Sequence, residues 1–138
     1  MSNVNIEETD KLMLDFFKIA KIAEKCKDVI PAAVQDADTR EVILIAYVNE
    51  RALKNTIETG IATFWSTSRN ELWIKGKESG NTYSIKDIFV NCEQNSLVYT
   101  VKANRGGICH TNNKNGEPRN CYYRKIDFQT SKLENMNP

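Results

Sequence analysis

Four segments in the middle of this chain are rich in aromatic and β-branched residues, and short runs containing Gly, Asn or Ser separate them. Residues of the first kind favour the pleated, half-buried surface of a sheet, whereas the separating residues favour turns. The pattern therefore predicts a central, mostly antiparallel β-sheet. Its predicted strands are residues 62–66, 72–75, 83–92 and 97–102.

An amphipathic helix is predicted before this sheet. In residues 8–26 apolar side chains recur at steps of three and four, after the capping residues Thr9 and Asp10. The apolar face of this helix is wider than a single stripe, which is typical of a helix covered on two sides. A second subunit is one way to cover it.

A hairpin and a second, short helix are predicted between the first helix and the sheet. Residues 32–35 and 41–48 have the composition of two strands joined by a polar turn. Asn49 is a good N-cap for a helix over residues 50–59, and Gly60 supplies the left-handed stop. The predicted order is therefore helix, hairpin, short helix and sheet.

The length and composition indicate one domain over residues 1–138. With 41% hydrophobic residues, 27% charged residues and a net charge of +1, the chain has no electrostatic reason to bind nucleic acid or an anionic membrane. No leader or membrane-spanning segment is recognisable, so a cytoplasmic location is expected. Residues 103–120 are predicted to form a long loop, and the polar tail 129–138 is expected to be frayed.

Three of the four cysteines lie within residues 92–121, at the end of a predicted strand, on the long loop and just after it. Thiolates are soft ligands that favour zinc, and three protein ligands leave the fourth tetrahedral position for a water molecule. Cys92, Cys109 and Cys121 are therefore predicted to bind one catalytic zinc ion. On spacing alone two alternatives stay open: Cys26 completes a closed structural site, or the cysteines are only small buried hydrophobes.

Other residues of the chain can contribute to catalysis at such a centre. His110 is the only histidine, and its imidazole can exchange protons with a water near neutral pH. Glu93, next to Cys92, is a second candidate acid. Hydroxyl and cationic side chains between the predicted strands are suited to phosphate, and the candidates are Ser66, Ser68, Arg69 and Lys75. Each of these residues could instead be a solvated surface group.

The chain resembles the phosphoribosyl-AMP cyclohydrolase family from about residue 29 to residue 126. The likeness rests on ordered motifs: Pro31-Ala32-Ala33-Val34-Gln35-Asp36-Ala37, Leu44-Ile45-Ala46-Tyr47-Val48-Asn49-Glu50, Ser66-Thr67-Ser68-Arg69, Leu72-Trp73-Ile74-Lys75-Gly76, Glu78-Ser79-Gly80-Asn81, Cys109-His110-Thr111 and Cys121-Tyr122-Tyr123-Arg124.

The resemblance implies an α+β homodimer in which both subunits build each zinc site and a water opens the adenine ring of phosphoribosyl-AMP between N1 and C6, in histidine biosynthesis. It implies that Cys92, Cys109 and Cys121 hold the zinc and that His110 does acid and base work. The attack parallels that of the zinc deaminases. Some family members are joined to a pyrophosphohydrolase, and the sequence leaves such an association open.

The chain departs from the family in the run around Cys92. The usual aspartates, which look like a magnesium site, are replaced by Asn91, Glu93 and Asn95, so we expect magnesium to bind weakly there. The loop before Cys121 is also longer than usual, and Tyr83 and Asn120 stand where glutamine and serine are common. Two alternatives therefore stay open: a related hydrolase for another phosphorylated purine, and a zinc-stabilised binding module.

Overall fold

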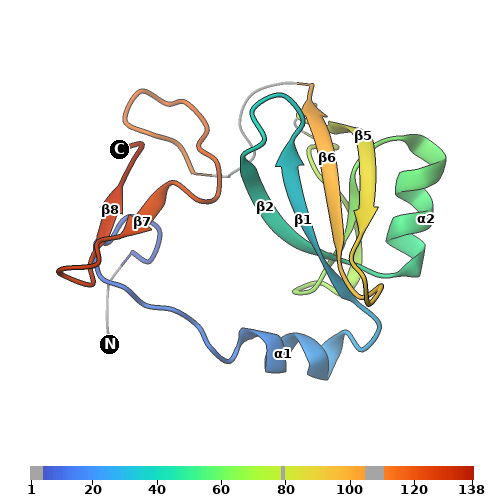
Figure 1. Ribbon diagram of the computed structural model, residues 1–138, viewed down its shortest axis with the longest axis horizontal. Helices are drawn as coiled ribbons and strands as arrows, with labels where there is room; N and C mark the ends of the chain where they lie inside the picture. The colour runs from blue at the N-terminus through green and yellow to red at the C-terminus, as the bar shows by residue number, and fades with distance from the viewer. Residues whose placement is uncertain (1–4, 79, 105–110) are drawn as a thin grey trace.

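The structure of this protein, a computed structural model, describes residues 5–78, 80–104 and 111–138. Helices and strands combine in an α+β fold, as predicted (Figure 1). In chain order the elements are α1 Lys18–Lys25, β1 Ile30–Asp36, β2 Val42–Val48, α2 Glu50–Thr59, β3 Thr63–Ser66, β4 Glu71–Ile74, β5 Tyr83–Val90, β6 Leu97–Ala103, β7 Arg124–Ile126 and β8 Leu133–Asn135.

The central sheet has four strands in the order β2-β1-β6-β5. The pairs β1–β2 and β5–β6 are antiparallel, and the middle pair β1–β6 is parallel. The prediction of a mostly antiparallel sheet is therefore confirmed. Strands β3 and β4, which were expected in the same sheet, instead form a two-stranded sheet of their own.

One face of the central sheet carries the hydrophobic core. Val34 on β1 and Tyr99 on β6 are fully buried there, and the Tyr99 ring lies 5.7 Å from the ring of Phe64 on β3. Ala52 and Thr56 on α2 are buried as well. Helix α2 and the β3–β4 hairpin therefore cover this face, and their burial supplies the main driving force for folding.

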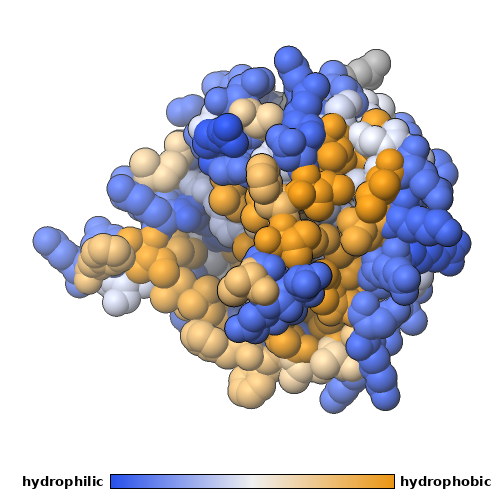
Figure 2. Space-filling view, turned by 45° about the vertical axis from the view of Figure 1, so that its right-hand side comes forward, coloured by the Kyte–Doolittle hydropathy of each residue, from blue (hydrophilic) through white to orange (hydrophobic). Residues whose placement is uncertain are grey.

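The other face of the sheet is apolar but open. Ile45, Ala33, Val98 and Phe89 are neighbours in register on the strands β2, β1, β6 and β5, so they form one row across the sheet. Ile45 is 49% exposed and Phe89 is 55% exposed. In the view of Figure 2 apolar side chains gather in a band bordered by hydrophilic ones. A continuous exposed apolar patch of this kind marks a contact surface.

Helix α2 has the predicted bounds because its end signals are local. The Asn49 side chain accepts a hydrogen bond from the backbone N–H of Ala52 at 2.9 Å, which caps the first turn. Gly60 has a φ of 72°, the left-handed conformation that glycine adopts readily at a helix end.

The prediction for the first helix was wrong at its start, because α1 begins at Lys18 rather than near residue 8. The Asp15 carboxylate accepts a hydrogen bond from the N–H of Phe17, and the Thr9 hydroxyl accepts one from the N–H of Lys11. These side chains form local turns instead of capping a helix. Phe16 and Phe17, expected on the apolar helix face, are exposed before α1.

The prediction of a frayed tail was also wrong. Strand β8 pairs with β7, and the Asp127 carboxylate supports the turn between them by accepting hydrogen bonds from the N–H groups of Gln129 and Thr130. The tail is therefore part of the fold in spite of its polar composition. In the part of the chain that the structure describes, no helix is both long and apolar enough to cross a membrane.

Candidate functional site

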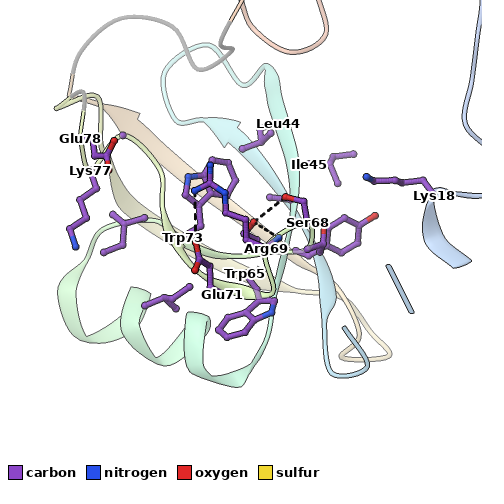
Figure 3. A pocket seen from close by; sticks show the side chains of 17 residues that line it. Lys18, Leu44, Ile45, Trp65, Ser68, Arg69, Glu71, Trp73, Lys77 and Glu78 are labelled. Atoms are coloured by element: carbon purple, nitrogen blue, oxygen red, sulfur yellow. Dashed lines mark hydrogen bonds and ion pairs between the residues drawn. The ribbon is translucent and has the colours of Figure 1, made fainter. Parts of the chain in front are cut away.

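A groove of about 770 Å³ runs between strand β2 and the β3–β4 hairpin (Figure 3). Leu44, Ile45, Ala46 and Tyr47 of β2 form one wall, while Trp65, Trp73 and the turn between β3 and β4 form the other. Lys18, the first residue of α1, lines the groove as well. Aromatic walls with a few cationic and hydroxyl groups suit a ligand that combines a ring system with phosphate.

The predicted phosphate-binding residues Ser66, Ser68 and Arg69 are brought together in the groove wall. The hydroxyl oxygens of Ser66 and Ser68 lie 3.4 Å apart, and the backbone N–H of Arg69 donates to the Ser66 hydroxyl at 3.3 Å. The Arg69 guanidinium is 3.8 Å from the Glu71 carboxylate, and its side chain is 76% exposed. Its charge is therefore accessible to a ligand.

Lys75, the fourth predicted phosphate ligand, is not among the residues that line the groove. Its ammonium lies 5.4 Å from the centre of the Trp73 ring, a distance at which a cation is attracted to the ring face. Lys75 therefore lies beside the groove. The sequence did not identify Lys18, Trp65 and Trp73 as groove residues. The register of the β3–β4 hairpin, in which Trp73 lies opposite Phe64, was a signal that could have placed Trp73.

The end of α1 holds the turn that carries these groups. Asn70 has a φ of 55°, and its side-chain oxygen accepts a hydrogen bond from the Trp65 indole at 2.9 Å. The buried Cys26 thiol donates to the same oxygen at 3.4 Å, and the Lys25 ammonium donates to the Ser68 carbonyl at 3.1 Å. The structure thus gives Cys26 a hydrogen-bonding role at this turn.

Of the predicted zinc cluster, Cys92 and Cys121 are described, while Cys109 and His110 lie outside the described residues. Neither of these two cysteines is in a disulfide; Cys92 is exposed in the turn after β5, and Cys121 is half-buried. The backbone N–H of Cys121 donates to the Ile43 carbonyl of β2 at 3.3 Å. The two cysteines are therefore attached to opposite edge strands of the sheet.

The strand register separates the two thiols along the strands as well. Cys92 follows Val90, which pairs with Leu97 near the first residues of β1, whereas Ile43 lies level with the last residues of β1. With usual strand spacings the two cysteines are roughly 20 Å apart. Zinc–sulfur bonds are about 2.3 Å long, so the two thiols of one chain cannot bind the same ion.

Two tyrosines lie near enough to Cys121 for its thiolate form to raise their pKa values. Burial raises the pKa of Tyr83 to about 12, and the charges of Cys121 and Asp36 add to this rise. Burial also raises the pKa of Tyr122, again with a contribution from Cys121. At neutral pH the Tyr83 side chain is therefore a neutral phenol beside the thiol.

The predicted magnesium residues form a hydrogen-bonded turn between β5 and β6. The Asn91 side-chain oxygen accepts from the backbone N–H groups of Asn95 and Ser96, both at 2.9 Å. The Asn91 amide donates to the Asn95 oxygen at 2.6 Å, and the Asn95 amide donates to the Glu93 carboxylate at 3.2 Å. Both amide oxygens are thus already engaged within the turn.

Within residues 5–78, 80–104 and 111–138, no three His, Cys, Asp or Glu side chains are grouped closely enough to hold a metal ion. This agrees with the separation of Cys92 from Cys121 in a single chain. A zinc site that uses both cysteines therefore requires a second copy of the chain.

Residues 44–123 match the family model described as phosphoribosyl-AMP cyclohydrolase. The phosphoribosyl-AMP cyclohydrolase of Methanothermobacter thermautotrophicus is 46% identical over 107 residues, which cover 78% of this chain and 73% of the relative. That of Cenarchaeum symbiosum is 46% identical over 75% of this chain and 90% of the relative. The histidine biosynthesis bifunctional protein HisIE of Caldanaerobacter subterraneus is 44% identical over 75% of this chain and 48% of the relative.

Proposed function

We propose that this chain, which belongs to the phosphoribosyl-AMP cyclohydrolase family, is a zinc-dependent hydrolase that opens the adenine ring of phosphoribosyl-AMP between N1 and C6 in histidine biosynthesis. One observation carries the proposal: the range matched by the family model, residues 44–123, contains every residue predicted for the site. The three cysteines proposed to bind zinc, the proposed proton-transfer residue His110 and the phosphate-binding turn are thus all within the range that the family shares.

The ligand chemistry supports zinc, because three thiolates favour this ion over hard cations such as magnesium. When bound with an open fourth position, zinc would lower the pKa of a water and so prepare it to attack C6. His110 would accept a proton from the attacking water and deliver one to N1, the ring nitrogen that leaves. Because hydrolysis adds one water and releases no fragment, these two transfers balance.

A homodimer with one zinc ion per subunit accounts for the positions of the cysteines. Cys92 of one subunit would join Cys109 and Cys121 of the other, since the roughly 20 Å between Cys92 and Cys121 in one chain is too long for a shared ion. The open apolar row from Ile45 to Phe89 offers a surface for the pairing. A two-fold axis would generate two such sites.

The groove beside β2 is the proposed place for a substrate phosphate. Arg69 can donate two charge-assisted hydrogen bonds to phosphate oxygens, and Ser66 and Ser68 can donate from the same turn. Lys75 would add positive charge from beside the groove. Magnesium binding at Asn91, Glu93 and Asn95 would be weak, because Glu93 is the only carboxylate of the three.

The test is to incubate the purified, zinc-loaded protein with phosphoribosyl-AMP and follow the ultraviolet change of ring opening, with zinc content per subunit measured on the same preparation. Turnover is expected with zinc alone. His110→Ala should retain its zinc and lose about two to four orders of magnitude in rate, the usual effect of removing a general base. Absence of turnover with zinc, with or without magnesium, would contradict the proposal.

A second candidate is a hydrolase of the same family that acts on another phosphorylated purine. The amides of Asn91 and Asn95, which are bonded to each other, favour it because they change the surroundings of Cys92. Expression of the gene in a bacterium that lacks its own phosphoribosyl-AMP cyclohydrolase separates the two candidates. Growth without histidine is expected for the first candidate and no growth for the second.

A further inference from the structure

The segment of residues 5–10, here called the N-terminal segment, is bonded to the C-terminal part of the chain (Figure 1). The Arg124 guanidinium donates to the carbonyl oxygens of Ile6 and Thr9 at 2.8 and 3.1 Å. The Tyr123 hydroxyl donates to the Glu7 carbonyl, and the backbone N–H of Leu133 donates to the Asp10 carbonyl at 2.6 Å. The N-terminal segment and the C-terminal part of the chain therefore form one unit beside the main sheet.

Arg119 lies at the centre of this unit and is only 3% exposed. Its guanidinium donates to both oxygens of the Glu8 carboxylate, at 2.6 and 3.4 Å, and to the Asn137 carbonyl at 2.8 Å. It also lies 4.4 Å from the centre of the Tyr123 ring. A buried guanidinium with these partners is fixed in place, and without its carboxylate it would be an uncompensated buried charge.

The backbone of Arg119 is attached to the segment that carries Cys121. Its N–H donates to the Thr111 carbonyl at 3.1 Å, and Cys121 follows two residues later with its own bond to Ile43. Residues 112–118, between Thr111 and Arg119, are mostly polar and exposed, so they add little hydrophobic burial that would fix this segment. Its position therefore depends on a small number of polar contacts, among them those of Arg119 with Glu8 and Asn137, of Asn120 with Glu41, and of Cys121 with Ile43.

We propose that Glu8 and Arg119 are positioning residues that hold Cys121 where the metal site requires it, so that the N-terminal segment is a working part of the site. The role in zinc retention rests on the proposed function, whereas the positioning of the Cys121 thiol does not. Glu8 reaches the thiol only through Arg119 and takes no part in the reaction.

The alkylation rates of Cys121 and Cys92 in the full-length, metal-stripped protein test the positioning directly. Iodoacetamide is the probe, and mass spectrometry of peptides measures each cysteine separately. Glu8→Ala should raise the rate at Cys121 about tenfold through local opening and leave the rate at the exposed Cys92 unchanged. Lys21→Met is the matched control, since it breaks the exposed ion pair of Lys21 with Asp15 at 3.5 Å.

Equal Cys121 rates in the wild type and a folded Glu8→Ala variant would overturn the proposal. So would a rise at both cysteines alike, because that shows general loosening. If Glu8→Ala does not fold, Arg119→Lys, which keeps the charge but loses the two-pronged bond, takes its place under the same criteria.

A metal readout connects the positioning with the site. In the zinc-loaded Glu8→Ala variant, transfer of zinc to a coloured chelator should be about tenfold faster than in the wild type. The visible absorption of the cobalt-substituted variant should shift, because cobalt bands report the ligand geometry around the ion. Unchanged transfer together with an unchanged cobalt spectrum would overturn the role in the metal site. A wild type that binds no zinc would instead refute the proposed zinc chemistry, and alkylation alone would then decide the positioning.

Discussion

Cys92 and Cys121 lie on opposite edges and at opposite ends of the four-stranded sheet, with roughly 20 Å between them. If each zinc site takes Cys92 from one subunit and Cys121 from the other, two inactive variants can restore a site between them. In a mixed dimer of Cys92→Ser and Cys121→Ser, one site lacks both cysteines and the other is intact.

The prediction is that each variant alone is inactive and that refolding them together in equal amounts restores about a quarter of the wild-type activity, since half of the dimers are mixed and each has one site. The ring-opening assay measures it, and refolding each variant alone is the control. No recovery in a mixture that gel filtration shows to contain dimers would contradict a shared site.

Cys26→Ser should retain the full zinc content. The Cys26 thiol is buried at the β3–β4 turn and donates to Asn70, so it is already used within its own part of the fold. Serine can make the same hydrogen bond, and only a small loss of stability is expected. Metal analysis of the purified variant checks this; loss of zinc would support the closed structural site and the binding module instead.

Arg69→Met should raise KM for the phosphorylated substrate about tenfold to a hundredfold, because a hydrogen bond to a charged group contributes about 1.5–3 kcal/mol. The free energy of unfolding should change by less than about 0.5 kcal/mol, since the ion pair with Glu71 is exposed and 3.8 Å long. Steady-state kinetics and urea unfolding separate the two effects. Arg51→Met, on the exposed surface of α2, is the control.

Gly76→Ala should destabilise the fold by about 3 kcal/mol or more. Gly76 has a φ of 80°, and a Cβ built on it would lie 1.9 Å from the backbone oxygen of Asn81, so the chain itself must shift. Gly60→Ala is the matched control, because Gly60 has a similar φ of 72° with nothing within 4 Å of the added carbon. Its expected cost is about 1–2 kcal/mol. Urea unfolding of both variants measures the difference.

The stability of the hairpin β1–β2 should depend on the charge of Asp36. Its carboxylate accepts hydrogen bonds from the backbone N–H groups of Thr39 and Asp38, and the bond from Thr39 is the main cause that lowers the pKa of Asp36. A lowered pKa adds stability above the ordinary value of about 4, and this is lost as the pH falls through the folded value. Asp36→Asn should therefore flatten the loss of stability in acid, as thermal unfolding between pH 2 and about 7 would measure.

Features that depend on neighbouring residues were predictable from the sequence. The cap at Asn49 and the stop at Gly60 determine α2 locally, and the strand composition predicted β1 to β6. The turn with Ser66, Ser68 and Arg69 was predicted for the same reason, since its members are close along the chain.

Features that depend on distant residues were not. The pattern of apolar steps in residues 8–17 resembles a helix, but this region instead forms local turns. Its residues Thr9 and Asp10 bond to Arg124 and Leu133, more than 100 residues away. The polar tail 129–138 has no apolar pattern and is ordered by pairing with β7. Likewise the spacing of Cys92 and Cys121 carried no sign that the sheet lies between them.

The contact of Glu8 with Arg119 also sets an order of events during synthesis, since the two residues are 111 positions apart. A ribosome adds about 5–20 residues per second, so Glu8 waits roughly 5 to 20 s before its partner is made. Strand β1 likewise waits for β6, whose first residue Leu97 pairs with Ala32. The residues around Glu8 are therefore made early but reach their final place late, and a nascent chain halted before residue 119 leaves Glu8 without its Arg119 partner.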